Sequence, residues 1–303
     1  VIELDWYIFY QCYKLETAIF AEGIQITSIP DGMFTYCENL REIVIPATVI
    51  VIETEAFSGN YKLSTITFAP GSQIEYIGDF AFSGNSSLIS FTLPDTVTTI
   101  GMYAFSYNTK LISFNFGENS QLTTLGQNVF SDNSSMVNIV LPETVTSIGA
   151  ALFYNCISLE TFTFPANVTS IPSNMFYNCL ELVSVYFSET SAITAVGSLA
   201  FMYCDSLADI TLPDTVTTIG YNAFFQCNSL VEMYLPSSLI KIDNYGFYDC
   251  DLLTNIIYGD PYSLEYIGSY AFSLCPELDE LFIADTVTYV GVRAFDNTHN
   301  VIL

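Results

Sequence analysis

Residues 212–230, LPDTVTTIGYNAFFQCNSL, carry a pattern that recurs from one end of this chain to the other. When the copies are aligned on the residue equivalent to Phe224, thirteen copies follow one another at spacings of 23 or 25 residues. We call these aligned residues the anchor phenylalanines: Phe9, Phe34, Phe57, Phe82, Phe105, Phe130, Phe153, Phe176, Phe201, Phe224, Phe247, Phe272 and Phe295. A fixed period of this length is typical of a solenoid, because one short unit cannot bury its apolar face without a neighbour.

Apolar residues recur at fixed distances from each anchor phenylalanine. Around Phe224 they are Val216, Ile219 and Leu230, and in the preceding copy Ile210 and Leu212 stand nine and eleven residues after the anchor. The last two alternate with polar residues in Asp-Ile-Thr-Leu, which is the period-two pattern of a half-buried strand. We therefore expect one strand per coil and a parallel sheet across the coils.

Proline and glycine mark where each predicted strand ends and where the chain turns. Pro213 follows the strand and lacks the N–H that a sheet needs, and Gly220 suits a tight corner. The AF-containing segment that comes next is too short for a full helix, so we expect a single helical or 3₁₀ turn there. The predicted fold is a mostly β solenoid, with one strand per 23- or 25-residue coil in a parallel sheet and short helical or 3₁₀ turns on the other side.

The string LPDTVTTIG..AF..C.SL resembles the BspA-type leucine-rich repeat, also called the Treponema-type repeat, over the whole chain. The resemblance implies a curved right-handed solenoid. It also implies surface-exposed or secreted proteins of bacteria and parasitic protists that bind host proteins or other cells. The strong acidity of this chain departs from the family. We expect residues 1–303 to form a single array of about thirteen repeats that is part of a longer chain.

The charge of the chain bears on its partners. Its net charge is −26, from 32 acidic and 6 basic side chains, so its surface repels phosphate groups. Nucleic acid and anionic membranes are therefore poor partners, whereas basic protein surfaces and divalent cations are better ones. The alternative is that the charge only keeps a long solenoid soluble. No apolar run approaches the roughly 18 residues of a membrane span, so none is expected in this segment.

The longer repeats place their two extra residues between the strand and the next extended piece. These longer loops are residues 21–25, 69–73, 117–121, 188–192 and 259–263. The same edge gathers carboxylates such as Asp95, Glu118 and Glu143. Calcium needs about six to eight oxygens converging on one point, and no loop here has such dense acidic spacing. Calcium on this acidic loop edge is the one metal that the sequence leaves open, and we expect no other metal and no cofactor.

Every cysteine stands three residues after an anchor phenylalanine, in a column that other copies fill with asparagine. The cysteines are Cys12, Cys37, Cys156, Cys179, Cys204, Cys227, Cys250 and Cys275, and the asparagines are Asn60, Asn85, Asn108 and Asn133. This exchange indicates a side chain that is buried at a turn and contacts backbone groups. Neighbouring coils would hold the cysteines at a distance that a disulfide can bridge. We favour a ladder of free thiols, because side chains in parallel register point the same way.

The sequence contains no recognisable catalytic constellation. His299 is the one histidine, and it has no cysteine or serine partner at a known spacing. Asp95 and Glu143 could be proposed as a sugar-hydrolysing carboxylate pair, but that chemistry needs a deep cleft. We therefore predict no catalytic residues and no enzyme activity.

The outward strand positions near the end of the chain are the candidate partner-binding site. Tyr186, Tyr234, Ile257 and Phe282 are predicted to stand exposed there, interleaved with Asp209, Glu232 and Glu280. Exposed aromatic residues ringed by polar ones are typical of a protein-binding patch. The alternative is that they only stabilise their cross-strand neighbours.

Three Asn-x-Ser/Thr sequences occur, at Asn85, Asn133 and Asn167. The first two fall in the buried column and should stay unmodified. Asn167 falls on the exposed edge between strand and loop, and it is the candidate glycosylation site.

These patterns favour a non-catalytic, extracellular or cell-surface repeat scaffold that mediates protein binding or adhesion. The alternative is a structural subunit of an extracellular filament or coat. Such a subunit would bind other copies of itself through repeat ends at Val1 and Leu303 that lack polar caps.

Overall fold

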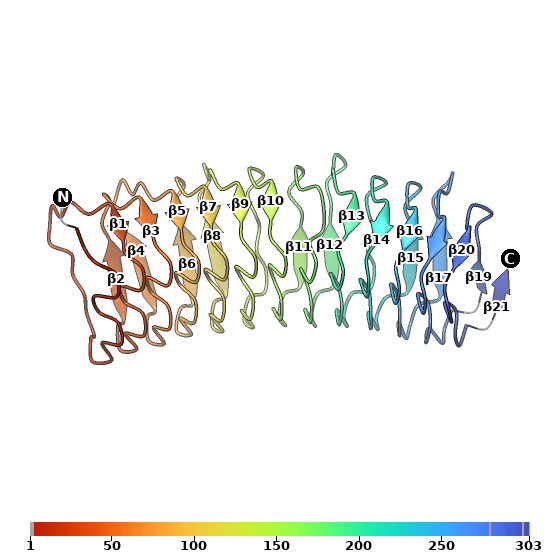
Figure 1. Cartoon of the computed structure of the whole chain (residues 1–303), viewed down its shortest axis with the longest axis horizontal. Helices are drawn as coiled ribbons and strands as arrows, with labels where there is room; N and C mark the ends of the chain where they lie inside the picture. The colour runs from red at the N-terminus through yellow and green to blue at the C-terminus, as the bar shows by residue number, and fades with distance from the viewer. Residues whose placement is uncertain (1–2, 279, 299, 303) are drawn as a thin grey trace. The chain divides into compact units, whose positions relative to one another are not determined.

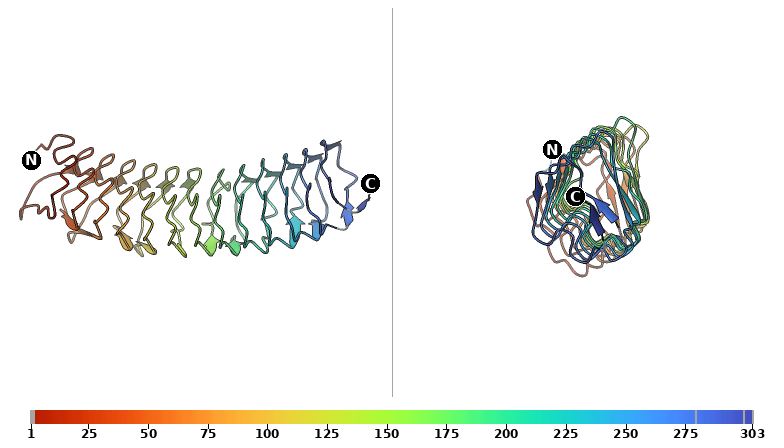
Figure 2. Two further views of the ribbon diagram at one scale, coloured as in Figure 1. Left: turned by 90° about the horizontal axis from the view of Figure 1, so that it is seen from below. Right: turned by 90° about the vertical axis from the view of Figure 1, so that its right-hand side faces the viewer.

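The computed structural model describes residues 3–278, 280–298 and 300–302, and the chain folds as two compact units. Unit 1 is Val1–Cys156 and unit 2 is Ile157–Leu303. Within each unit the chain winds through successive coils that lie side by side (Figures 1 and 2). Each unit is therefore a solenoid, while the single array over residues 1–303 stays a prediction.

The predicted strands form in both units and pair in parallel. In unit 1 they are β2 (Glu42–Ile45), β4 (Thr65–Phe68), β6 (Ser90–Leu93) and β8 (Ser113–Phe116). In unit 2 they are β11 (Thr161–Thr163), β12 (Ser184–Tyr186), β15 (Glu232–Leu235), β17 (Asn255–Tyr258), β19 (Glu280–Phe282) and β21 (Asn300–Ile302). The paired strands align without slippage, as in the pairing of Phe91 with Phe114. The parallel-strand leucine-rich-repeat fold is thereby confirmed.

A second parallel sheet is formed by the piece that the sequence analysis described only as extended. Its strands in unit 1 are β1 (Ser28–Ile29), β3 (Val51–Ile52), β5 (Tyr76–Ile77), β7 (Thr99–Ile100), β9 (Thr124–Leu125) and β10 (Ser147–Ile148). In unit 2 they are β13 (Ala195–Val196), β14 (Thr218–Ile219), β16 (Lys241–Ile242), β18 (Tyr266–Ile267) and β20 (Tyr289–Val290). Many coils thus contribute two strands, where one was predicted. A strand of two residues is too short to show period-two alternation, which is why the sequence did not reveal it.

The segment around each anchor phenylalanine is not the helical or 3₁₀ turn that was predicted, since the structure has no helix among its described residues. Around Phe105, Tyr103 and Tyr107 have φ angles of 56° and 57°. Left-handed residues at this spacing interrupt a right-handed helix. The N–H groups of Tyr103, Phe105 and Tyr107 instead donate to carbonyls of the next coil, at 2.8, 3.0 and 2.9 Å. The turn segment therefore acts as a third set of hydrogen bonds between coils.

The glycine before each turn is required by close packing between coils. Gly126 does not have a positive φ, so it does not form the tight corner that the sequence predicted for this column. A Cβ placed on it would lie 2.7 Å from the backbone nitrogen of Met102 in the preceding coil. Glycine therefore lets the two coils approach each other.

The anchor phenylalanines form the centre of the core. Eleven of the rings are buried, and Phe9 and Phe295 at the two ends are half-buried. The rings stack from coil to coil, with Phe57 and Phe82 at 5.3 Å between centroids and Phe224 and Phe247 at 5.1 Å. The rings of both pairs are parallel to within 2°. Adjacent coils are thus joined by aromatic contacts as well as by hydrogen bonds.

Apart from Cys12, the column of cysteines and asparagines is buried, as predicted, and its members contact backbone groups. The backbone N–H of Asn85 donates to Oδ1 of Asn108 at 2.7 Å, and Nδ2 of Asn85 donates to the Phe82 carbonyl at 2.8 Å. Where cysteine replaces asparagine, the thiol of Cys156 donates to the Phe130 carbonyl at 3.0 Å. Both residue types bond to a carbonyl of an anchor phenylalanine, so they can exchange.

The eight cysteines are in the reduced thiol form, as predicted, and seven of them are buried. Cys12, which was predicted to be buried, is exposed. The thiol of Cys37, one coil further on, is buried and donates to the Phe9 carbonyl at 3.0 Å. Burial raises the pKa of Cys37 to about 11 and that of Cys156 to about 12. These two thiols therefore stay protonated well above neutral pH.

This difference predicts selective thiol labelling. At pH 8 and without denaturant, one equivalent of iodoacetamide should react rapidly, because Cys12 is exposed and the other seven cysteines are buried. Mass spectrometry of tryptic peptides would locate the label, and Cys12→Ser should abolish the fast phase. Rapid labelling of several cysteines in the folded Cys12→Ser protein would contradict the buried column.

Candidate partner-binding surfaces

The residue ten positions after each anchor phenylalanine points outward from its strand. In unit 2, Tyr186, Ile257 and Phe282 are 54%, 44% and 41% exposed, and Tyr234 is half-buried. All four predicted partner-binding residues therefore reach the surface. We call them the strand-face patch. Whether they bind a partner stays a prediction.

Three of the four patch residues are neighbours and one is not. Tyr234 on β15 pairs directly with Ile257 on β17, and Phe282 lies one coil further on β19. Thr211 pairs with Tyr234 on its other side, so Tyr186 lies two coils away from Tyr234. The contiguous part of the patch is Tyr234, Ile257 and Phe282.

Two tyrosines that the sequence analysis did not select extend this part of the patch. The hydroxyl of Tyr258 donates to the Phe282 carbonyl at 2.7 Å, and the two rings are 6.0 Å apart. Tyr262, from the longer loop 259–263, places its ring 5.9 Å from Tyr258 and 6.4 Å from Phe282. Burial raises the pKa of Tyr258 to about 12. Tyr258 could have been noticed in the sequence, because it stands in the apolar column that Leu212 and Leu235 occupy in other copies.

Polar groups surround the contiguous patch. Glu232, two residues before Tyr234 on the same outward face of β15, accepts a hydrogen bond of 3.0 Å from Nδ2 of Asn255. Asp209 and Asp260 are exposed, and the side chain of Glu280 lies outside the described residues. Carboxylates thus border an apolar centre, as the sequence analysis expected.

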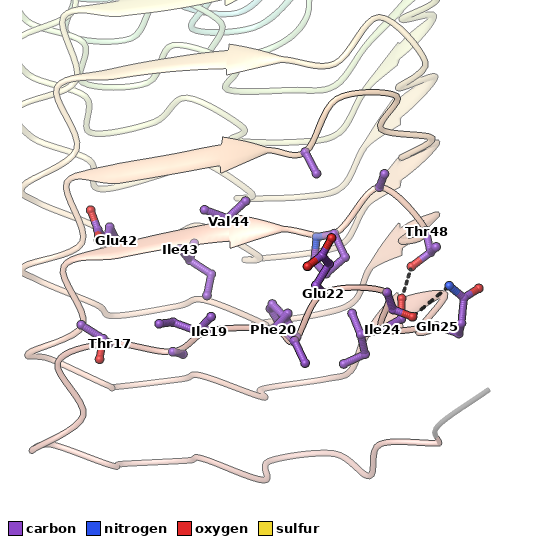
Figure 3. Close-up of a pocket in the computed structure, with 16 residues that line it drawn as sticks. Thr17, Ile19, Phe20, Glu22, Ile24, Gln25, Glu42, Ile43, Val44 and Thr48 are labelled. Carbon is purple, nitrogen blue, oxygen red and sulfur yellow. Dashed lines mark hydrogen bonds between the residues drawn. The ribbon is translucent and has the colours of Figure 1, made fainter.

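The strand face of unit 1 is bordered by three shallow cavities, each with a longer loop as one wall. The first, of about 390 Å³, lies between loop 21–25 and strand β2 (Figure 3). The others, of about 570 and 580 Å³, are walled by residues of loops 69–73 and 117–121. Outward aliphatic residues, Ile19 and Val44, line the first cavity. The longer loops therefore lie beside the strands, as their fixed position predicted.

The acidic edge of unit 1 does not gather its carboxylates at one point. Glu118 and Glu143 line the cavity of about 580 Å³, whereas Asp95 packs against Gly117 and is not among the lining residues. Within the described part of the chain, no group of three or more histidine, cysteine, aspartate and glutamate side chains is placed to hold a metal ion. His299 lies outside that part. The calcium prediction stays untested.

The asparagines of the three Asn-x-Ser/Thr sequences differ in their exposure to solvent. Asn85 and Asn133 are buried in the asparagine column, and Asn167 is exposed. The predicted facing of these residues is confirmed, while glycosylation of Asn167 stays a prediction.

The chain has the fold of solved leucine-rich-repeat proteins. The crystal structure of a leucine-rich repeat protein from Bacteroides ovatus ATCC 8483 is similar with a TM-score of 0.76 and 27% sequence identity, over 95% of this chain and 80% of that one. The pneumococcal vaccine antigen PcpA is similar with a TM-score of 0.56 and 21% identity, over 87% of this chain and 79% of that one. Among curated proteins no match was found. No helix in the described residues has the length and apolar character that crossing a membrane requires.

The family comparison agrees with these structures. The model described as "BspA type Leucine rich repeat region (6 copies)" matches residues 1–74, 70–183 and 194–302. It describes a repeat scaffold and indicates no enzyme family. With nearly all of its residues matched, the chain belongs to the BspA-type leucine-rich repeat family.

Proposed function

We propose that this chain is a non-catalytic scaffold that binds a protein partner through the strand-face patch of unit 2, at the cell surface or outside the cell. Membership of the BspA-type family supports the general role, because leucine-rich-repeat scaffolds typically bind proteins. Adhesion to another cell is the form of binding that the resemblance implies. Assembly into filaments, the alternative from the sequence, stays a prediction.

The observation that carries the proposal is the contiguity of apolar side chains that reach the surface from neighbouring strands. Tyr234, Ile257 and Phe282 stand on neighbouring coils, and Tyr258 and Tyr262 pack beside them. Aromatic side chains in a fixed arrangement lose little conformational entropy on binding and dominate the energetics of many interfaces. The surrounding carboxylates would select a partner whose matching surface is basic.

Hydrogen bonding also holds this arrangement in place before a partner arrives. The Tyr258 hydroxyl ties β17 to the backbone of Phe282. A Cβ on Gly259 would lie 2.9 Å from the Tyr234 hydroxyl, so glycine at that position leaves room for the Tyr234 side chain. A preorganised surface avoids part of the ordering cost of association.

Replacing Tyr234 and Phe282 by threonine tests the proposal. Threonine already stands in this column at Thr163 and Thr211, so the strands should tolerate the change. We expect binding to a partner identified from a panel of purified extracellular proteins to weaken at least about tenfold. The melting temperature should change little. Surface plasmon resonance and circular dichroism would measure these two properties.

Val140→Thr is the matched control for this double substitution. Val140 occupies the same column in unit 1 and is 76% exposed. Its replacement should leave the affinity unchanged. A Tyr234→Thr/Phe282→Thr protein that binds as tightly as the unmodified chain would exclude the strand-face patch as the contact.

A further inference from the structure

Unit 2 carries a second aromatic surface, built from residues next to the anchor phenylalanines. Seven rings from successive coils form one continuous chain of contacts, which we call the aromatic ladder: Tyr177, Tyr203, Tyr221, Phe225, Tyr245, Tyr248 and Tyr270. Centroid distances between contacting rings run from 5.0 Å for Phe225 and Tyr248 to 5.8 Å for Tyr203 and Phe225. No residue of this ladder belongs to the strand-face patch.

The ladder lies on the outside of the turn segments. Tyr221 is 43% exposed and the other six residues are half-buried, whereas the anchor phenylalanines beside them are fully buried. Tyr245 and Tyr270 have φ angles of 59° and 58° and stack to within 2° of parallel. Asparagine, which adopts this conformation more readily than tyrosine, takes the same column at Asn222. The tyrosines thus form a surface at a position where the turn does not need them.

Carboxylates accompany the rings. Burial raises the pKa of Tyr248, and the negative charges of Asp249 and Asp296 raise it further. Asp249 also accepts a 2.6 Å hydrogen bond from Nε2 of Gln226. Asp205 and Asp251, two coils apart on the same edge, are exposed and close enough to interact. Residues 157–303 contain seventeen acidic and two basic side chains.

The two basic residues leave most of this charge uncompensated. Lys241 bonds to Asp243 at 2.9 Å and lies over the Tyr266 ring. Arg293 stands in the coil after that of Tyr270, and both residues are two positions before their anchor phenylalanine. Neither forms an ion pair with the four carboxylates named above among the described residues.

We propose that the aromatic ladder binds an arginine- and lysine-rich segment of a partner protein. Guanidinium planes stack on tyrosine and phenylalanine faces, and the ring electrons attract the positive charge. The neighbouring carboxylates add long-range attraction and accept hydrogen bonds from the same groups. A neutral sugar would use the rings but gain nothing from the charge, so the basic segment fits this surface better.

Binding of a labelled peptide tests this surface directly. The probe is a fluorescein-labelled peptide of alternating arginine and glycine, and its matched partner has neutral citrulline in place of arginine. We expect fluorescence anisotropy to show saturable binding of the arginine peptide and at least about tenfold weaker binding of the citrulline peptide. Equal affinity for the two peptides would overturn the proposal.

The decisive variant is Tyr245→Asn combined with Tyr248→Ser. Other coils already have asparagine and serine at these positions, at Asn128 and Ser131, so the fold should persist. Its affinity for the arginine peptide should fall roughly tenfold. The control is Phe80→Asn with Tyr103→Asn, which removes a stacked pair from unit 1, at 4.8 Å between centroids. This control should bind as the unmodified chain does.

Several results would contradict the proposal. One is an unchanged affinity in the Tyr245→Asn/Tyr248→Ser protein. Another is an equal loss in the unit 1 control, which would show that exposed turn rings in general, and not this ladder, bind the peptide. A third is that a neutral oligosaccharide loses affinity in the Tyr245→Asn/Tyr248→Ser protein while the arginine peptide keeps its affinity. If the double variant unfolds, Asp249→Asn leaves all rings in place and should still weaken peptide binding several-fold. The Tyr234→Thr/Phe282→Thr protein should retain peptide binding, which separates this surface from the strand-face patch.

Discussion

Phe105→Ala is expected to lower the free energy of unfolding by about 3–5 kcal/mol. The Phe105 side chain is fully buried, and its ring contacts Phe91 at 4.7 Å, Phe114 at 4.9 Å and Phe82 at 5.2 Å. Truncation to alanine removes these contacts and leaves a cavity that backbone hydrogen bonds between coils prevent from collapsing. Urea unfolding followed by circular dichroism would measure the loss.

Phe80→Asn is the control for this substitution. Phe80 stands on the outside of a turn with a φ of 55°, and its ring is 37% exposed. Asparagine tolerates that conformation, so the change should cost well under half of the Phe105→Ala effect. A loss of less than about 1 kcal/mol for Phe105→Ala would show that the anchor phenylalanines do not hold neighbouring coils together.

Asn108→Ala should cost about 3 kcal/mol, because it leaves several buried polar groups without partners. The Asn108 side chain accepts a hydrogen bond from the Asn85 N–H at 2.7 Å. Its Nδ2 donates to the carbonyls of Phe82 and Phe105 at 3.1 and 2.9 Å. All of these groups lie in the interior, where water cannot replace the lost bonds.

Asn108→Cys is the informative comparison. A thiol in this column donates to a carbonyl of the preceding coil, as Cys156 does at 3.0 Å, but it cannot replace the strong acceptor Oδ1. Its cost should therefore fall between zero and that of Asn108→Ala when both are measured by urea unfolding. An alanine variant as stable as the cysteine variant would show that the column contributes shape alone.

Several features of the fold could be predicted because they repeat in side-chain chemistry. Ile210 and Leu212 alternate with polar residues, which predicts a strand without reference to any contact. The exchange of Cys156 for Asn133 in one column predicts a buried side chain that bonds to the backbone, as the structure confirms. The outward facing of Tyr234 and Phe282 followed from the same alternation.

Other features left no trace in residue type. Tyrosine is disfavoured at positive φ, so nothing at Tyr103 or Tyr107 indicated left-handed turns in place of a helical one. Hydrogen bonds to the next coil stabilise that conformation, and they exist only once the coils have stacked. The aromatic ladder was missed for a related reason. Its members stand at several different distances from their anchors and meet only in space.

The repeat architecture, the residues of the interior and the outward strand positions could be predicted from residue types alone. Those properties depend on apolar periodicity within each copy. The path of each turn, the second sheet and the contacts of Tyr258 and Tyr262 with Phe282 became evident only in the folded chain. These depend on contacts between coils, because a backbone group or a ring in one coil finds its partner about 23 residues away.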